Sequence, residues 1–274
     1  MAYNLLKGKK GIIFGALDEK SIAWKTALKC YEEGAQLVLT NAPVALRMGT
    51  INQLAAECGN APVIGADVTN LEDLKSLVEK SMEHFGGKLD FILHSVGMGL
   101  NVRKGKHYTE MNYEWNQKTF DISSMSLHKV LKTCWELDAL NEHASVIALT
   151  YIAAQRVFPD YNEMADAKAL LESVARMFGY YYGERKKVRI NTISQSPTPT
   201  TAGSGVKGFG SFIDYAAKMS PLGNAPAEAC ADYVAVMFSD LTKYVTMQNL
   251  FHDGGFSSMG VTEQVLTAMG KETE

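Results

Sequence analysis

The stretch Gly11-Ile-Ile-Phe-Gly-Ala-Leu-Asp-Glu-Lys-Ser-Ile22 decides the fold. Its first four residues form a short apolar run that is typical of a buried strand, and apolar residues recur at helical spacing from Ile22 onward. The turn between them begins at Gly15 and ends at Ser21. A glycine-led turn between a strand and a helix exposes backbone N–H groups at a helix N-terminus, which suits a pyrophosphate. Because the spacing is not G-x-G-x-x-G, the turn alone favours neither cofactor binding nor a plain strand–helix connection.

Strand-like and helix-like segments alternate along the rest of the chain. Six more apolar runs are predicted as strands: Gln36–Leu39, Pro62–Gly65, Asp90–Leu93, Ser145–Leu149, Val188–Ile193 and Thr246–Phe251. Apolar spacing predicts further helices over Ala45–Glu57, Leu71–Phe85, Trp115–Leu137, Asn162–Tyr182 and Ala227–Phe238. Strands separated by helices imply right-handed crossovers. We therefore predict a single α/β domain over residues 1–274, a doubly wound, Rossmann-like fold whose seven-stranded parallel sheet has helices on both faces.

The segment from Ser194 to about Met219 is rich in Gly, Ser, Thr and Pro and has no sustained apolar period. We expect it to be an irregular loop. Folds of this kind place ligand-covering loops just beyond the carboxyl ends of strands. The sequence therefore predicts a substrate-covering lid at about residues 194–219.

Composition excludes several classes of function. A formal net charge of −3 gives no electrostatic basis for binding nucleic acid. The chain has no long apolar segment at its start and no run of about 18 apolar residues, so we expect a cytoplasmic protein that does not contact a membrane. The cysteines are scattered and lack a C-x-x-C pair, so we expect free buried thiols rather than disulfides or a metal site. They are Cys30, Cys58, Cys134 and Cys230.

Two tyrosines and a lysine have a spacing that suits a nicotinamide-dependent reductase. Tyr161 and Lys168 share one face if they lie on a helix, and Tyr151 follows an apolar run where a strand would end. A phenol can polarise a substrate oxygen, while a nearby ammonium lowers the pKa of the phenol and holds a ribose. The spacing alone is weak evidence, because Tyr180 and Lys187 have it too.

A set of short motifs strengthens this interpretation. In chain order they are Gly15-x5-Ser21-Ile-Ala-Trp24, Asp67-Val68, His94-Ser-Val-Gly97, Asp121-Ile-Ser-Ser124, Leu149-Thr-Tyr151, Tyr161-Asn-x-Met164 with Lys168, Arg189-Ile-Asn191, Pro197 and Asp253-Gly-Gly255. Together they resemble the short-chain dehydrogenase/reductases and, within them, the bacterial enoyl-acyl carrier protein reductases of type II fatty acid synthesis. Most short-chain dehydrogenases use Tyr-x-x-x-Lys with a serine earlier in the chain, but Ala165 and Ala148 occupy those positions here. A tyrosine in place of the serine and a lysine seven residues after Tyr161 match the enoyl reductase pattern.

The resemblance implies a reaction and a role for each site residue. The reaction is reduction of the trans-2 double bond of an enoyl-acyl carrier protein thioester by NADH, the last step of the fatty acid elongation cycle. Tyr161 would donate a hydrogen bond to the enolate oxygen, Lys168 would hold the ribose hydroxyls, and Tyr151 would help to place the thioester. The implied substrate-binding residues are Tyr151, Tyr161, Met164 and Phe209. The implied cofactor-binding residues are Gly15, Ser21, Ile22, Asp67, Val68, Ser95, Val96, Gly97, Lys168, Pro197, Thr198 and Thr200.

The choice of cofactor depends on the end of the second strand. Residues Thr40-Asn41-Ala42 contain no acidic side chain for a ribose 2′-hydroxyl and no adjacent arginine for a 2′-phosphate. Arg47 is the nearest cation and lies a turn into the next predicted helix. We expect NADH, and the sequence leaves NADPH open.

The resemblance also implies partners. The family forms homotetramers, through helices that correspond here to residues around 115–137 and 162–182. The enoyl chain arrives on acyl carrier protein, which is acidic. Of the basic residues that relatives cluster beside the lid, only Lys207 remains here, so docking either uses Lys218 or the group Arg103–Lys106 or is weak. Two alternative functions stay open: another short-chain reductase acting on a carbonyl or activated alkene, and a non-catalytic dinucleotide-binding sensor.

Overall fold

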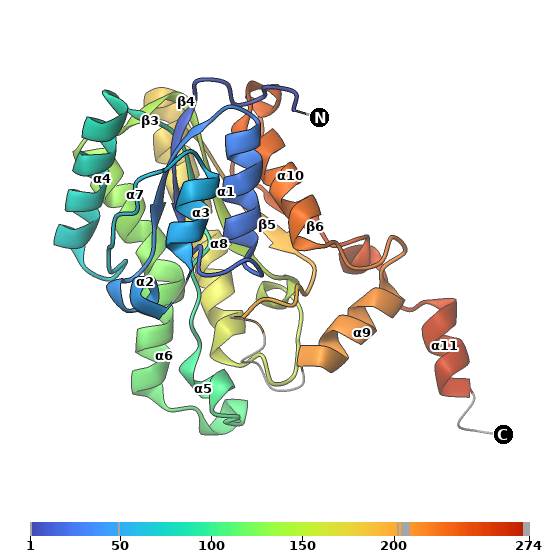
Figure 1. Cartoon of the computed structure of the whole chain (residues 1–274). Helices are drawn as coiled ribbons and strands as arrows, with labels where there is room; N and C mark the ends of the chain where they lie inside the picture. Colours follow the sequence, from blue (N-terminus) through green and yellow to red (C-terminus); the bar gives the residue numbers. More distant parts are fainter. Residues whose placement is uncertain (1, 49, 202, 204–208, 271–274) are drawn as a thin grey trace.

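A computed structural model describes residues 2–48, 50–201, 203 and 209–270 (Figure 1). Six parallel strands form one sheet in the order β2-β1-β3-β4-β5-β6. They are β1 (Lys10–Phe14), β2 (Gln36–Thr40), β3 (Leu89–His94), β4 (Leu140–Thr150), β5 (Arg189–Gln195) and β6 (Asn249–His252). The direction of the winding reverses between β1 and β3, and such a switch point opens a crevice beyond the carboxyl ends of these strands. The predicted doubly wound α/β fold is confirmed.

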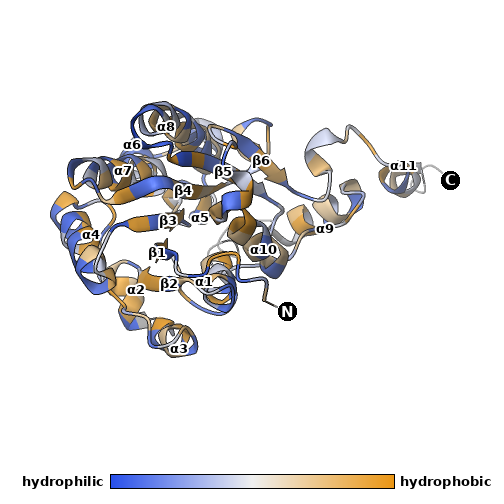
Figure 2. Ribbon diagram, turned by 90° about the horizontal axis from the view of Figure 1, so that it is seen from above, coloured by the Kyte–Doolittle hydropathy of each residue, from blue (hydrophilic) through white to orange (hydrophobic). Residues whose placement is uncertain are grey.

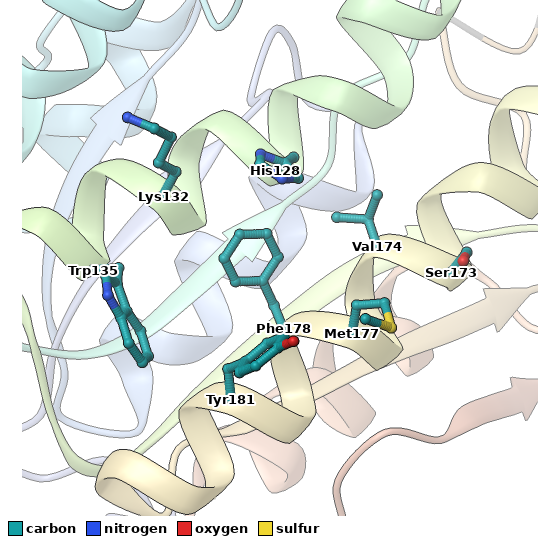
Figure 3. Close-up of a pocket in the computed structure, with 8 residues that line it drawn as sticks. All are labelled: His128, Lys132, Trp135, Ser173, Val174, Met177, Phe178 and Tyr181. Atoms are coloured by element: carbon teal, nitrogen blue, oxygen red, sulfur yellow. The ribbon is translucent and has the colours of Figure 1, made fainter.

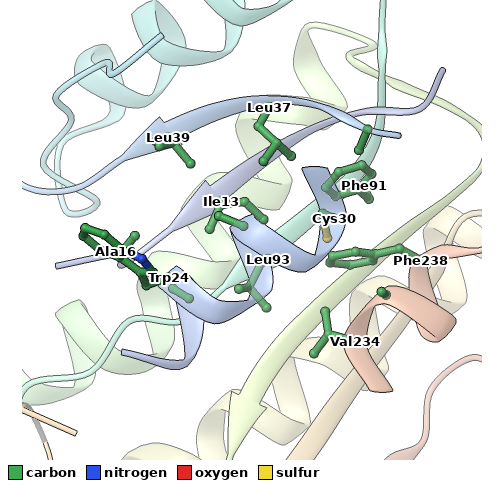
Figure 4. Close-up of a cluster of buried hydrophobic side chains, with 14 of the residues drawn as sticks. Ile13, Ala16, Trp24, Cys30, Leu37, Leu39, Phe91, Leu93, Val234 and Phe238 are labelled. Carbon is green, nitrogen blue, oxygen red and sulfur yellow. The ribbon is translucent and has the colours of Figure 1, made fainter. Parts of the chain in front are cut away.

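Helices cover both faces of the sheet (Figure 2). One face packs against α1 (Ile22–Glu32), α3 (Ile51–Glu57) and α10 (Ala227–Phe238). The other packs against α4 (Leu71–Phe85), α7 (Ser126–Glu136) and α8 (Glu163–Lys186). On the first face, Trp24 and Cys30 of α1 and Phe238 of α10 meet the sheet, and the rings of Phe91 and Phe238 stack with centroids 4.5 Å apart (Figure 4). Apolar side chains on both faces of the central strands explain why these strands read as nearly continuous apolar runs.

Local signals explain where the main helices begin and end. Asn70 caps α4 by accepting hydrogen bonds from the backbone N–H groups of Glu72 and Asp73, and Gly86 ends this helix with φ +61°. Helix α6 (Tyr113–Phe120) continues through a π-helical turn, η2 (Asp121–Met125), into α7. The remaining helices are α2 (Pro43–Met48), α5 (Leu100–Arg103), α9 (Phe209–Met219) and α11 (Glu263–Gly270).

One of the seven predicted strands, Pro62–Gly65, is not a strand of the sheet. Among the described residues this segment forms a single parallel bridge, between Val63 and Leu39 at the edge of the sheet. Pro62 accepts a hydrogen bond from the Leu39 N–H (2.9 Å), but its own nitrogen carries no hydrogen to donate. The segment therefore runs along β2 without extending the sheet.

The predicted irregular loop over 194–219 also needs correction. Ser194 and Gln195 end β5, and α9 occupies the second half of the segment, where Ala216 and Met219 are buried. Gly, Ser, Thr and Pro are concentrated before α9, whereas apolar residues such as Phe212, Ile213 and Ala216 are concentrated within it. Residues 202 and 204–208, including Lys207, lie outside the described part of the chain.

Two further expectations concern the helices and the cysteines. None of the described helices combines the length and the apolar character needed to cross a membrane. The four cysteines are buried and unpaired, as expected.

Candidate active site

The crevice between β1 and β3 brings two predicted cofactor residues into contact. Gly15, which follows β1, has φ +93°, a conformation that residues with a side chain rarely adopt. A Cβ atom at this position would lie 1.9 Å from the carbonyl oxygen of Ser95, which follows β3. The Gly15 N–H donates to the carbonyl of Thr40 at the end of β2 (3.1 Å). Glycine is therefore required here for the close packing of two backbone turns.

The start of α1 faces the same crevice. The Ser21 hydroxyl caps this helix by accepting a hydrogen bond from the Trp24 N–H (3.2 Å), and it donates to the carbonyl of Asp18 (2.9 Å). Ile22 begins the helix, whose first turn contains no acidic side chain. Positive helix-dipole charge and N–H groups at this end suit a pyrophosphate. The Gly15 turn, which a Cβ would fill, and this helix end fit a dinucleotide.

The other side of the crevice contains polar groups suited to the adenosine end of a dinucleotide. Asp67 is exposed, and its Oδ1 accepts hydrogen bonds from the Thr69 N–H (2.8 Å) and hydroxyl (2.7 Å). The Asn41 side-chain amide donates to the carbonyl of Ala16 (2.9 Å), which ties the end of β2 to the first turn. Arg47 is exposed on α2. The other side chains at the end of β2 offer no positive charge for a 2′-phosphate.

Gly97 connects the crevice to α8. It is exposed, and a Cβ atom there would lie 3.6 Å from Met164 Cε and 3.8 Å from Lys168 Nζ. Val68 and Val96 are half-buried and pack against the core beneath α4 and α7. Gly97 thus leaves an open surface directly beside the predicted catalytic lysine, where a flat ring can approach.

The Lys168 side chain is buried, with 8% of its surface exposed. Its Nζ donates a hydrogen bond to the carbonyl of Leu149, near the end of β4 (2.8 Å). Burial lowers the pKa of Lys168 from 10.5 to about 8, and the nearby Glu172 opposes this shift. The lysine is therefore fixed in place and sensitive to its electrostatic surroundings.

The two predicted tyrosines lie side by side. The ring centroids of Tyr151 and Tyr161 are 5.2 Å apart. Burial raises the pKa of both phenols, and for Tyr151 the neighbouring Tyr161 adds to the rise. The expectation that an ammonium would lower the pKa of Tyr161 is therefore wrong, because burial dominates. Each phenol keeps its proton near neutral pH and can donate a hydrogen bond.

The backbone on either side of Tyr161 is unusual. Asp160 has φ +65° and Asn162 has φ +47°, and residues with a side chain adopt such angles at an energetic cost. The Asn162 amide donates to the carbonyl of Lys106 (2.5 Å), which holds this backbone against the segment that follows α5. Tyr161 thus enters the site from a short strained link between the preceding loop and α8.

Glu163, the first residue of α8, is fully buried. Its Oε1 accepts hydrogen bonds from the backbone N–H groups of Asn101 (2.7 Å) and Val102 (3.3 Å) at the start of α5. Its Oε2 is a buried oxygen without a hydrogen-bond partner among the described residues. The carboxylate therefore anchors the first turn of α8 to α5.

The segment after β5 is held by its own side chains. The hydroxyl of Thr198, a buried residue, donates to the carbonyl of Ser196 (2.9 Å), and the Thr200 hydroxyl accepts from the Gly203 N–H (3.0 Å). Pro197 is half-buried between them. Farther along, the Thr201 hydroxyl donates to Asp18 in the first turn (2.6 Å). This loop therefore reaches the dinucleotide crevice from the β5 side.

Aromatic rings form an apolar wall next to the tyrosines. The centroid of the Phe158 ring lies 5.3 Å from that of Tyr151, 6.0 Å from that of Phe212 on α9 and 5.9 Å from that of Phe256. Phe158, Phe212 and Phe256 line a hollow of about 340 Å³. Phe209 begins α9, but its side chain lies outside what the structure describes, so its predicted substrate contact stays a prediction.

Sequence reasoning missed four polar or aromatic residues of this region. Glu163 and Glu172 are buried carboxylates of α8, and Phe158 and Phe256 come from segments far apart in the chain. Glu172 had a usable signal, because a glutamate four residues after Lys168 lies on the same helix face. No sequence signal marked the two phenylalanines, because aromatic residues in loops follow no periodic pattern.

A second hollow lies on the outer side of α7 and α8 (Figure 3). It has a volume of about 430 Å³, and the labelled side chains reach toward it from both helices. Its lining residues are His128, Lys132, Trp135, Ser173, Val174, Met177, Phe178 and Tyr181. Met177 and Tyr181 are more than half exposed, at 57% and 52%. This apolar face lies apart from the crevice.

Comparisons with known proteins show the family. The model of the family described as "Enoyl-(Acyl carrier protein) reductase" matches residues 15–257. The enoyl-[acyl-carrier-protein] reductase [NADH] FabI of Aquifex aeolicus is 33% identical over 94% of each chain. The crystal structure of the FabI–NADH complex from Alistipes finegoldii is 62% identical, covers 96% of this chain and 93% of that one, and superimposes with a TM-score of 0.95. The chain belongs to the enoyl-acyl carrier protein reductase family.

Proposed function

We propose that this protein uses NADH to reduce the trans-2 carbon–carbon double bond of an enoyl-acyl carrier protein thioester. The observation that carries the proposal is the grouping of Tyr151, Tyr161 and Lys168 beside Gly97 at the carboxyl edge of the sheet. Family membership and the relatives named as NADH-dependent support it. The end of β2 also favours NADH over NADPH, because no arginine lies next to Asn41 to bind a 2′-phosphate.

The chemistry divides between three side chains. When bound, NADH would supply a hydride for the β-carbon of the enoyl thioester, and the resulting enolate would take a proton from water at its α-carbon, giving the saturated thioester and NAD⁺. The Tyr161 hydroxyl, protonated at neutral pH, donates a hydrogen bond to the thioester oxygen as negative charge develops there. Lys168 holds the ribose hydroxyls of the cofactor and adds positive charge. Tyr151 and the aromatic wall exclude water and hold the acyl chain.

The dinucleotide would lie along the crevice. Gly15, Ser21 and Ile22 would face the pyrophosphate, because the open turn and the helix end meet there. Asp67 and Val68 would meet the adenine. The nicotinamide end would contact Ser95, Val96, Gly97, Pro197, Thr198 and Thr200.

We further propose a homotetramer in the cytoplasm. The exposed apolar side chains Met177 and Tyr181, beside the hollow between α7 and α8, support a contact between subunits on this face. Free buried cysteines support a reducing compartment. Acyl carrier protein, which is acidic, would dock on exposed basic residues such as Lys218 and the group Arg103–Lys106. Light scattering of the purified protein tests the assembly.

A spectrophotometric assay tests the activity. Oxidation of NADH, followed by its absorbance, should be rapid with a medium-chain trans-2-enoyl thioester and slow with a β-ketoacyl thioester or a simple ketone. NADPH should support lower turnover at equal concentration. Preferential reduction of ketones would contradict the proposal and point to another short-chain reductase.

A further inference from the structure

Glu172 lies one helical turn after Lys168 on α8, and its carboxylate is buried, with 4% of the residue exposed. Its Oε1 accepts hydrogen bonds from the Thr150 hydroxyl (3.0 Å) and the Asn249 amide (3.3 Å). Its Oε2 accepts a hydrogen bond from the Gln155 amide (3.0 Å). The donors come from β4, from β6 and from the turn after β4. Burial of a charge is costly unless it is well hydrogen-bonded, and this carboxylate has donors on both oxygens.

Glu172 and Lys168 hold the same short stretch of β4. Lys168 donates to the carbonyl of Leu149, and Thr150, the next residue, donates to Glu172. Tyr151 follows directly. The two side chains share one face of α8, because they are four residues apart. The negative charge of Glu172 acts on Lys168 against the effect of burial, which alone would favour the neutral amine.

We propose that Glu172 is a positioning residue: it keeps Lys168 protonated and, through Thr150, keeps the end of β4 in register with that lysine. The inference rests on the proposed function, in which a positive Lys168 holds the cofactor ribose. Loss of the Glu172 charge should therefore weaken cofactor binding most at the pH where Lys168 is about to lose its proton.

Other titratable groups near Lys168 do not change charge in the same pH range. Burial, with the charge of Lys168, lowers the pKa of His94 at the end of β3 to about 3, so that imidazole is neutral at pH 6 and above. Burial raises the pKa of the Tyr151 and Tyr161 phenols. A step in cofactor affinity near pH 8 would therefore report on Lys168, whose pKa is about 8.

The test is the dissociation constant of NADH, measured by fluorescence between about pH 6 and pH 9.5 on the whole protein. Wild-type affinity should fall as pH rises through about 8, because deprotonation of Lys168 removes its charge. In Glu172→Gln the fall should begin at lower pH. For a displacement of about one pH unit, affinity should be close to wild type near pH 6, weaker by roughly fivefold at pH 8 and weaker by roughly tenfold above pH 9. Lys168→Ala should bind weakly and show no such step.

Two variants serve as controls. Glu184→Gln removes an exposed carboxylate from the same helix and should leave the pH profile unchanged. Glu172→Asp keeps the charge but withdraws it by one methylene, so its midpoint should lie between those of wild type and Glu172→Gln. If Glu172→Gln does not fold, the midpoint measured for Glu172→Asp tests whether the charge of Glu172 sets the pH dependence of NADH binding.

Three results would overturn the inference. One is a uniform loss of affinity at every pH in the Glu172 variants, which would mean a structural role alone. Another is an unchanged midpoint in the Glu172 variants that fold. The third is a pH step that persists in Lys168→Ala. Failure of the proposed function would look different, because wild type would then bind NADH with this pH dependence and not turn over an enoyl thioester.

Discussion

The two turns of α8 that carry the candidate site are held in different ways. The first turn begins at Glu163, whose side-chain carboxylate accepts hydrogen bonds from backbone N–H groups of α5. Tyr161 lies just before this turn, between two residues with positive φ. The later turn, at Lys168 and Glu172, is held by side chains from other elements and by charge.

The two sets of contacts serve different needs: those at the start of α8 fix the position of a side chain, and those at Glu172 and Lys168 control charge. A phenol that must meet a developing negative charge needs accurate placement, and the hydrogen bonds between Glu163 and the backbone of α5 help to supply it. A lysine that holds a ribose must stay protonated, and the negative charge of a buried carboxylate favours its protonated form. We therefore expect changes in the first turn to alter the chemical step or stability, and changes in the later turn to alter cofactor binding and its pH dependence.

The largest effect should come from Tyr161→Phe. Removal of the hydroxyl leaves the ring in contact with Tyr151 but removes the hydrogen-bond donor, so kcat should fall by about 10²- to 10³-fold. The dissociation constant of NADH should stay within about twofold of wild type, since the lysine is untouched. Tyr244→Phe, at a fully exposed position, is the matched control. An unchanged kcat with every enoyl thioester would show that another group stabilises the enolate.

A smaller effect should follow from changes at Glu163. Glu163→Ala leaves the buried N–H groups of Asn101 and Val102 without their acceptor, which should lower the free energy of unfolding by about 1–3 kcal/mol. Glu163→Gln keeps a hydrogen-bond acceptor and should lower the free energy of unfolding by less. Urea unfolding measures both, with the exposed Glu184→Ala as a control that should stay within about 0.5 kcal/mol of wild type. If Glu163→Ala were as stable as the control, the anchor between α8 and α5 would be unimportant.

The sequence predicted the elements whose signals are local. The β1–α1 turn with Gly15 and the capped helix α4 were predicted from residues that lie next to one another in the chain. The candidate catalytic residues Tyr161 and Lys168 were found from their spacing, but the shared helix expected from that spacing is wrong. Helix α8 begins at Glu163, so Tyr161 lies just before it. The predicted strand Pro62–Gly65 was wrong because this apolar run at the sheet edge contains a proline and forms only a bridge to Leu39.

The features that the sequence did not predict depend on contacts between residues far apart in the chain. Glu172 is bonded to Asn249, 77 residues away, and no local pattern shows that such a carboxylate will be buried with donors on both oxygens. The pKa of Tyr161 was expected to fall because the lysine is near in sequence, whereas the fold buries the phenol and raises it. Helix α9 was missed because its flanking residues are rich in Gly, Ser and Thr.

The smallest effect should arise away from α8, at Phe212 of α9. Its ring lines the aromatic hollow and packs against Phe158, which in turn packs against Tyr151. Since an aromatic pair contributes about 0.5–1.5 kcal/mol, Phe212→Ala should raise the KM for a medium-chain enoyl thioester by roughly twofold to tenfold. Because the variant leaves both turns of α8 intact, kcat and the pH profile of NADH binding should be unchanged. Tyr244→Ala, which removes a fully exposed ring, should change neither constant. A large loss of kcat in Phe212→Ala would mean that α9 helps to place Tyr161, and that the first turn of α8 is not positioned by its backbone contacts alone.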